Sequence, residues 1–354
     1  MLKGHGGNLV AIAARFKVSN DSVIDFSASL NYSIPPKRLQ LWAQKAMANA
    51  GKYPDPEYNR LRGLLARKYS LKKGNILPGN GSTELLFLIP RALQCRNALL
   101  IAPSYADYAD ACISAGIRIK MSYLDESEGF ALNPEKLGYT AGKYDFVIIG
   151  NPNNPTGNII SRRNLLKVID KNPKSMFLID EAFMDFLPGE SIINSLRPNL
   201  IVVRSLTKFY GIPGVRMGFA AARAGVIKKL LQFKEPWTIN YIAEYLASMI
   251  CRESLNEAKE IRRVEKEREY LFGVLSAIPC LKVYPSVANF LLVRIVKRRL
   301  SSSRLQAMLL RKSILIRDCA NFEGLDPYYF RVAVKSRKEN LILIKALRES
   351  MEAK

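Results

Sequence analysis

Residues 205–219 read SLTKFYGIPGVRMGF, and this segment decides how the rest of the sequence is interpreted. It follows the apolar run Leu200 to Val203, which predicts a buried strand, so the chain should leave a sheet and present Ser205 and Lys208 in a loop. Glycines and a proline follow, which allow tight backbone turns around a ligand, and Arg216 offers a fork of donors suited to a phosphate dianion. Taken alone, Lys208 would be an ordinary surface lysine, so the other segments decide whether it has a role.

The middle of the chain alternates short apolar runs with helical stretches. Strands are expected at residues 98–102, 117–123, 146–150, 176–180, 200–203 and 219–222, and helices at residues 37–50, 58–69 and 105–115. Runs that are apolar on both faces, separated by helices, favour a mainly parallel sheet that is covered on each side. The sequence therefore predicts an α/β fold.

The ends of the chain are expected to form a second unit. One long helix is predicted over residues 241–277, then strands at 290–295, 314–317 and 329–334 and helices at 303–312 and 337–351, while Asn8 could cap a helical pattern over residues 9–16. A chain of 354 residues exceeds the usual size of one domain. We expect a large domain over residues 30–235 and a smaller α/β domain built from residues 1–29 and 236–354.

The charge balance is strongly basic, with 54 lysines and arginines against 31 aspartates and glutamates, a formal net charge of +23. Such an excess can mark a nucleic-acid-binding surface. The basic residues are scattered, however, and the densest charged stretch, residues 252–269, is nearly balanced in sign. We therefore interpret the excess as a solvated surface with a few arginines that meet anionic ligands, and we expect no nucleic-acid partner.

Cysteine and histidine usage excludes several kinds of site. The five cysteines are far apart and form no C-x-x-C pair, which favours a reducing cytoplasm and predicts no metal site. The only histidine, His5, lies near one end, so Ser-His-Asp, Cys-His and multi-histidine zinc chemistry are all disfavoured. No signal-peptide core is seen and no apolar run reaches the 18 to 20 or so residues that span a bilayer. We expect a soluble cytoplasmic protein.

Polar motifs follow the predicted strands, where ligands are expected in sheets of this kind. The segment GNGSTE at residues 79–84 opens a helix whose N-terminus could hold one phosphate, or it could be a plain turn and cap. The segment NPNNPTG at residues 151–157 could likewise be a turn. Asp180 ends an apolar run, and a carboxylate is costly to bury there without a positive partner, although it could instead cap the next turn.

In their order along the chain, these motifs resemble those of the fold-type I pyridoxal-phosphate (PLP) enzymes of the aspartate aminotransferase fold, over roughly residues 79 to 218. The resemblance implies that Lys208 carries the cofactor covalently and that Asp180 pairs with the ring nitrogen, which preserves the electron sink. It also implies a stacking aromatic, a donor to the phenolic oxygen, a phosphate cradle, and an aromatic that reaches the phosphate from a partner subunit. These are, in turn, Tyr105; Asn154; Gly81, Ser82, Ser205 and Arg216; and Tyr53, which implies a homodimer.

Within that fold, nearly the whole chain resembles the L-threonine-O-3-phosphate decarboxylases of cobalamin biosynthesis. The similarity includes HGGN at residues 5–8, DFSA at 25–28, DEAF at 180–183 and the segment from Ile316 to Asn321. It implies decarboxylation of L-threonine O-3-phosphate to (R)-1-aminopropan-2-yl phosphate. It further implies that His5, Gly6, Asn154, Arg317 and Arg331 bind the substrate.

Two departures keep alternatives open. The family commonly has asparagine where Ser29 stands, near the substrate, so O-phosphoserine is a second expected substrate. The close relatives that act as histidinol-phosphate aminotransferases usually have tyrosine where Phe183 stands and lack the HGGN opening, which makes that activity the alternative. A third alternative is a basic binding or regulatory protein that retains a PLP-like shell. A strand arginine such as Arg331 could also simply extend its charged end to solvent.

Overall fold

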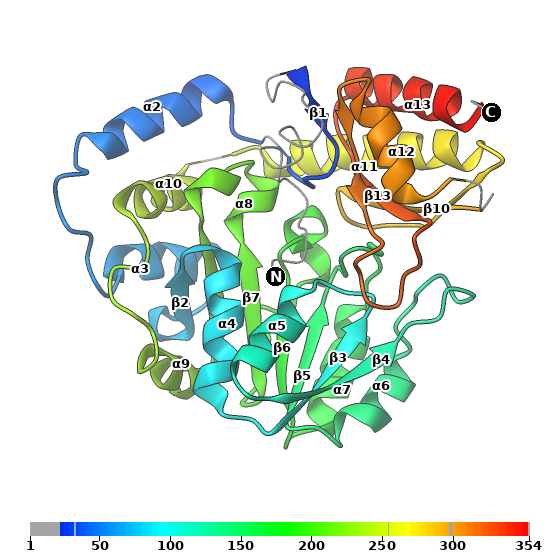
Figure 1. Ribbon diagram of the computed structural model, residues 1–354. Helices are drawn as coiled ribbons and strands as arrows, with labels where there is room; N and C mark the ends of the chain where they lie inside the picture. The colour runs from blue at the N-terminus through cyan, green and yellow to red at the C-terminus, as the bar shows by residue number, and fades with distance from the viewer. Residues whose placement is uncertain (1–21, 32, 254, 297–299, 353–354) are drawn as a thin grey trace.

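The computed structural model describes residues 22–31, 33–253, 255–296 and 300–352. A large mixed sheet stands at the centre of the molecule, and a smaller α/β unit that contains the C-terminal helix lies beside its upper edge (Figure 1). His5, Gly6 and the helix expected at residues 9–16 lie outside the described residues.

The large sheet has seven strands in the order β2-β8-β7-β6-β5-β3-β4. Only β8 runs antiparallel to its neighbours, and the other pairs are parallel. The strands are β2 (Ile76–Gly79), β3 (Asn97–Ala102), β4 (Arg118–Tyr123), β5 (Phe146–Gly150), β6 (Met176–Asp180), β7 (Leu200–Ser205) and β8 (Gly218–Ala222). Because β5, β6 and β7 are adjacent and parallel, the motifs that follow them meet at one edge of the sheet.

Helices cover both faces of this sheet. The β5 side chains alternate between the faces: Phe146 and Ile148 belong to one buried cluster, and Val147 and Ile149 to the other. The first cluster contains α4 (Gly81–Leu93), α5 (Asp107–Ser114) and α9 (Ala224–Leu231). The second contains α3 (Asn59–Lys68), α6 (Pro134–Ala141), α7 (Arg162–Lys171) and α10 (Tyr241–Arg252) and also receives side chains of α2 (Pro36–Met47). Burial on both faces explains why these strands read as continuous apolar runs.

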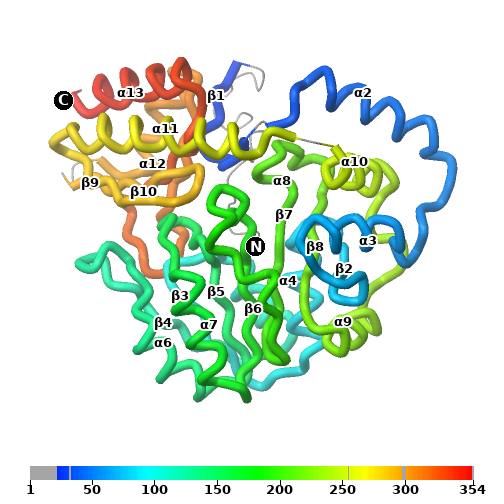
Figure 2. Tube along the Cα trace, turned by 180° about the vertical axis from the view of Figure 1, so that it is seen from behind, coloured from blue at the N-terminus to red at the C-terminus, as the bar shows by residue number. Residues whose placement is uncertain are grey.

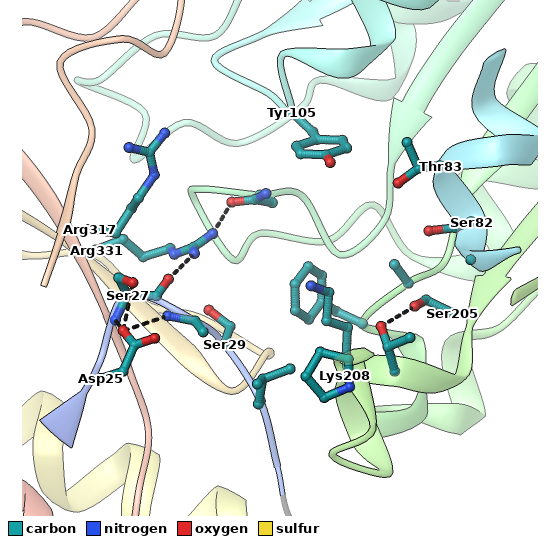
Figure 3. Close-up of a pocket in the computed structure, with 18 of the residues that line it drawn as sticks. Asp25, Ser27, Ser29, Ser82, Thr83, Tyr105, Ser205, Lys208, Arg317 and Arg331 are labelled. Carbon is teal, nitrogen blue, oxygen red and sulfur yellow. Dashed lines mark hydrogen bonds between the residues drawn. The ribbon is translucent and has the colours of Figure 1, made fainter. Parts of the chain in front are cut away.

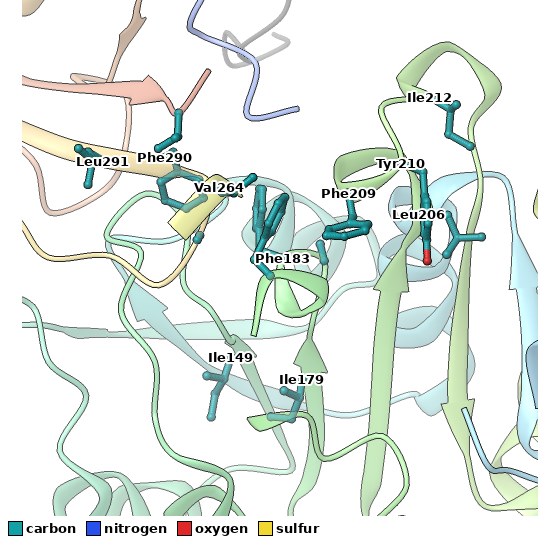
Figure 4. Close-up of a cluster of buried hydrophobic side chains, with 14 of the residues drawn as sticks. Ile149, Ile179, Phe183, Leu206, Phe209, Tyr210, Ile212, Val264, Phe290 and Leu291 are labelled. Carbon is teal, nitrogen blue, oxygen red and sulfur yellow. The ribbon is translucent and has the colours of Figure 1, made fainter. Parts of the chain in front are cut away.

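The smaller unit is built on a four-stranded antiparallel sheet in the order β12-β13-β10-β9. Its strands are β9 (Leu281–Val283), β10 (Phe290–Ile295), β12 (Arg317–Asp318) and β13 (Tyr329–Ala333). The helices α11 (Glu257–Ser276), α12 (Ser302–Leu310) and α13 (Arg337–Glu352) lie over it, as the view from behind shows (Figure 2). Side chains of this unit continue the second buried cluster, so the two units share one core (Figure 4).

The segment from β1 (Ile24–Asp25) onward joins the two units. β1 pairs in parallel with β11 (Ile314–Leu315) of the smaller unit. A few residues later, the backbone N–H of Asn31 donates to the backbone oxygen of Lys208 at 2.8 Å. The first described residues therefore pass along the edge of the large sheet where the motifs meet.

Three expectations about elements are wrong. Lys208 lies in a short helix, α8 (Leu206–Phe209), because the buried side chains of Leu206 and Phe209 anchor a helical turn directly after β7. The long helix expected over residues 241–277 is two helices, and the Asn256 side chain caps the second by accepting from the backbone N–H of Lys259. The strand expected at residues 314–317 is divided between β11 and β12, which pair in different sheets.

The predicted α/β fold with a mainly parallel sheet is confirmed. The predicted domain boundaries, near residues 30 and 236, remain a prediction. In the part of the chain that the structure describes, no helix combines the length and the apolar character needed to span a bilayer.

Candidate active site

A cavity of about 680 Å³ opens where the strand ends of the large sheet face the smaller unit (Figure 3). Its walls come from both units and from the segment after β1. Every predicted site residue that the structure describes lines this cavity, except Tyr53. Those residues are Gly81, Ser82, Tyr105, Asn154, Asp180, Ser205, Lys208, Arg216, Arg317 and Arg331.

Lys208 extends into the cavity from α8. Its ammonium form is disfavoured because the side chain is desolvated and because Arg331 and Arg216 add positive charge, and the nearby Asp180 opposes this only in part. These effects lower the pKa of Lys208 to about 8. A lysine in this state supplies a neutral amine near physiological pH, as an amine nucleophile requires.

Asp180 lies at the end of β6 with only 6% of its surface exposed. The Tyr108 hydroxyl donates to Oδ2 at 2.7 Å, and the Ala182 backbone N–H donates to Oδ1 at 2.9 Å. Burial raises the pKa of Asp180 above its usual range, while these hydrogen bonds and the Lys208 charge act in the opposite direction. A cation bound against this carboxylate, such as a protonated ring nitrogen, would offset the cost of burying its charge.

The N-terminus of α4 and the segment after β7 form a polar cradle. Ser82 and Thr83 of α4 line it together with Ser205 and Thr207, whose hydroxyls lie 2.8 Å apart. Across from them, Arg216 donates from Nη1 to the Pro213 backbone oxygen at 3.2 Å. Hydroxyls, backbone N–H groups at a helix start and a guanidinium are the donors that a phosphate dianion needs.

Glycine is needed in this cradle for room and for conformation. Gly81 has a φ of +77°, and a Cβ added to it would lie 2.8 Å from Nη2 of Arg216. A Cβ on Gly218 would lie 2.6 Å from the backbone nitrogen of Ser82. The space beside the donors is therefore kept open by residues without side chains, so the cradle fits a bound phosphate.

Tyr105 and Asn154 face the cavity between the cradle and the arginines of the smaller unit (Figure 3). The Tyr105 ring contacts the Tyr108 ring edge to face, with centroids 5.6 Å apart. That contact fixes one flat aromatic wall, which suits a planar ring. The Asn154 side-chain oxygen accepts a hydrogen bond from Nη1 of Arg331. Asn154 therefore connects the cofactor side of the cavity with the side that bears the arginines.

Arg331 and Arg317 are directly opposite one another on β13 and β12. Arg331 is only 6% exposed, and its hydrogen bonds go to neutral oxygens, those of the Asn154 side chain and the Ser27 backbone. Burial, reinforced by the Arg317 charge, lowers the pKa of Arg331 to about 10. Like charges opposite each other on a sheet repel, so an anion bound between them would be stabilised.

Two groups of predicted residues are not brought into this cavity. Tyr53 lies on the surface with 85% of its area exposed, beside Trp237 at a centroid distance of 5.4 Å. His5 and Gly6 lie outside the residues that the structure describes. The roles expected for these three residues therefore remain predictions.

Sequence reasoning missed several residues of the cavity. Tyr108 binds Asp180, and its spacing of three residues from Tyr105 at the start of a helix could have revealed it, because residues i and i+3 share a face. Thr83 and Thr207 were adjacent to identified motifs but carried no signal of their own. Lys335 and Glu339 follow β13 at the far side of the cavity, and only the folded chain brings them there.

The comparisons with known proteins agree with this geometry. The family model described as aminotransferase class I and II matches residues 22–347. The threonine-phosphate decarboxylase of Salmonella typhimurium is 34% identical over 355 residues, covering 97% of this chain and 95% of its own.

Two solved structures are similar over most of the fold. The histidinol-phosphate aminotransferase of Clostridium acetobutylicum has a TM-score of 0.85 at 31% identity, covering 92% of this chain and 98% of its own. The L-threonine-O-3-phosphate decarboxylase of Porphyromonas gingivalis has a TM-score of 0.83 at 28% identity, covering 93% of this chain and 99% of its own.

Proposed function

Because this chain belongs to the aminotransferase class I and II family, we propose that it catalyses the PLP-dependent decarboxylation of L-threonine O-3-phosphate. The product is (R)-1-aminopropan-2-yl phosphate, for the side chain of cobalamin. The observation that carries the proposal is the similarity over 97% of the chain to a threonine-phosphate decarboxylase. The cavity supports it, because a lysine, a buried aspartate and two arginines of the smaller unit face one space.

The residues present fit pyridoxal 5′-phosphate. Lys208 would hold it covalently, Asp180 would hold a proton at its ring nitrogen, and Tyr105 and Asn154 would contact its ring and phenolic oxygen. Ser82, Ser205 and Arg216, with the backbone at Gly81, would hold its phosphate. When bound, the cofactor supplies the electron sink for the electrons left at Cα after loss of carbon dioxide.

The chain's own residues then orient the substrate. Arg317 and Arg331 would bind its anionic groups, and their fixed positions would direct the carboxylate away from the plane of the ring, as bond cleavage requires. The Lys208 amine would hold or deliver a proton at the substrate Cα. His5 and Gly6 are proposed to close over the substrate.

Analysis of the products from three substrates tests the function. The purified protein with PLP is incubated separately with O-phospho-L-threonine, O-phospho-L-serine and histidinol phosphate plus 2-oxoglutarate. We expect carbon dioxide and an amino-alcohol phosphate from phosphothreonine, with phosphoserine as a second, slower substrate. If glutamate forms from histidinol phosphate and no gas is released from phosphothreonine, the decarboxylase proposal is wrong.

Histidinol-phosphate transamination is the second candidate, favoured by the solved aminotransferase with a TM-score of 0.85. Phe183 and the HGGN segment at residues 5–8 argue against it. The remaining alternative, a binding protein that retains a PLP-like shell, is disfavoured by the family match. It would regain support only if no Lys208-dependent cofactor absorbance appeared.

We also propose that the enzyme is a cytoplasmic homodimer whose subunits share their sites. Tyr53 does not line the cavity of its own chain and is 85% exposed, and a twofold partner could receive it at its phosphate cradle. The indole Nε1 of Trp237 donates to the Pro54 backbone oxygen at 3.1 Å, which holds the segment that carries Tyr53. No nucleic-acid partner is proposed.

A further inference from the structure

Two hydrogen-bond donors in the cavity wall have no partner among the described residues. They are the Ser29 hydroxyl and Nε of Arg331. Both side chains line the cavity, and they are only 3% and 6% exposed. Buried polar groups in native proteins are nearly always hydrogen-bonded, so two such exceptions in one cavity call for a ligand that meets them.

The backbone around Ser29 is held from both sides. Toward the smaller unit, the Asp25 carboxylate accepts from the backbone N–H of Ser27 at 2.7 Å, and Nη2 of Arg331 donates to the Ser27 oxygen at 2.9 Å. Toward the large sheet, Asn31 bonds to the backbone of Lys208. Figure 3 shows Ser29 between Ser27 and Lys208. The hydroxyl is therefore positioned between the residue expected to bind the substrate anion and the residue expected to carry the cofactor.

The two donors restrict the chemistry of the ligand. Nε of Arg331 can only donate, so the ligand atom that meets it must be an acceptor. The positive charge of Arg331, with Arg317 opposite it, favours an anionic acceptor. The serine hydroxyl can then donate to the same anionic group. The shared chemistry is a carboxylate or phosphate oxygen, and both occur on a phospho-amino acid.

We propose that Ser29 is a substrate-binding residue whose hydroxyl donates to the anionic group that Arg331 binds. This inference rests on the proposed function for the identity of the substrate. A small hydroxyl leaves more room than a longer amide would, so Ser29 also sets how closely the substrate must fit at this point. The free enzyme carries the unsatisfied hydroxyl because only the substrate completes its hydrogen bond.

Ser29→Ala tests the proposal, and Ser350→Ala is its matched control. The Ser350 hydroxyl is likewise 3% exposed and without a partner, but it lies on α13 and does not line the cavity. Loss of a donor to a charged acceptor should raise the KM for phosphothreonine about tenfold or more in Ser29→Ala, with a much smaller change in kcat. Ser350→Ala should leave both constants unchanged. Ser29→Cys, which keeps a weaker donor of similar size, should lie between wild type and Ser29→Ala.

Thermal unfolding of the protein without substrate separates binding from folding. Removing a buried hydroxyl that has no partner should leave the melting temperature of Ser29→Ala equal to or above that of wild type. A purely structural role would instead lower the melting temperature. Equal KM values in Ser29→Ala and wild type, or a lower melting temperature together with a higher KM, would overturn the proposal.

Titration of the PLP-loaded enzyme with two further ligands identifies the anion. Histidinol phosphate carries a phosphate and no carboxylate, and L-threonine carries a carboxylate and no phosphate. The ligand whose affinity falls in Ser29→Ala contains the group that Ser29 binds, and unchanged affinity for both contradicts the proposal. If wild type released no carbon dioxide but Ser29→Ala still weakened histidinol phosphate binding, the decarboxylase proposal would fail while the binding role of Ser29 stood.

Discussion

At the scale of single residues, Lys208 shows how the cavity tunes one side chain. Desolvation is the largest cause of its lowered pKa, and the charges of Arg331 and Arg216 add to it. Both arginines are expected to bind anionic groups, those of the substrate and of the cofactor phosphate. The same cations that prepare the site for anions therefore also keep the lysine amine neutral.

The pH dependence of cofactor attachment follows from that pKa. Only the neutral amine forms the bond, and the pKa of Lys208 lies at about 8 instead of near 10.5. In the apoenzyme, the rate of PLP attachment should rise about tenfold per pH unit below pH 8 and level off above it. Stopped-flow absorbance between pH 6 and 9.5 measures this rate. A rate that continues to rise up to pH 10 would contradict the lowered pKa.

At the scale of elements, the start of α4 matters most for the phosphate cradle. Gly81 begins the helix in a left-handed conformation and lies against the Arg216 guanidinium. Its backbone N–H and those that follow point along the positive end of the helix dipole. A side chain at this position would both strain the backbone and displace the arginine.

Gly81→Ala should weaken PLP binding about tenfold or more, because its Cβ would stand 2.8 Å from Nη2 of Arg216. Gly225→Ala, in the first turn of α9, is the control, since a Cβ there meets no atom within 4 Å. That control should bind PLP normally and be slightly more stable. Absorbance titration of the two apoproteins with PLP measures both affinities. Equal affinities would show that the cradle does not depend on this glycine.

At the scale of the whole molecule, the cavity exists only while the two units stay in position. Glu126, in the segment after β4, joins them: it accepts from the Tyr284 hydroxyl at 2.6 Å, and Lys282 and Arg294 lie 3.0 and 2.5 Å from its carboxylate. Burial by itself would raise the pKa of Glu126, but the hydrogen bonds from Tyr284, Lys282, Tyr329 and Arg294 lower it to about 2.

A depressed carboxylate pKa in the folded state stabilises the protein above the unfolded pKa of 4.5 and loses this contribution as the pH falls toward 2. The melting temperature of wild type should therefore fall between pH 5 and 3. Glu126→Gln should melt lower than wild type at pH 7, and the difference should shrink toward pH 3. Asp170→Asn, which breaks the exposed pair with Arg197, serves as the control and should change little. A constant difference at all pH values would exclude titration of Glu126 as the cause.

Shared sites in a dimer predict complementation between inactive variants. Tyr53→Ala and Lys208→Ala should each have little activity alone. After unfolding and refolding as a mixture, half of the dimers should be mixed, and each mixed dimer should contain one intact site. Activity should then return to about a quarter of the wild-type value. No recovery, or full activity of Tyr53→Ala alone, would exclude a shared site that depends on Tyr53.

The sequence by itself determined the sheet and the order of the motifs along it. Apolar runs such as residues 146–150 and 176–180 coincide with β5 and β6, because strands buried on both faces must be apolar throughout. Asp180 and Asn154 could be identified for the same reason, since each is a polar residue that follows such a run.

The tertiary structure alone decided which distant residues share the cavity. Tyr108 meets Asp180 across 72 positions, and Arg331 meets Asn154 across 177. Ser29 is unsatisfied only because the fold buries it where no protein acceptor lies. Local patterns report the burial of a segment, whereas the partners of a buried polar group depend on which elements pack together. That packing is a property of the whole chain.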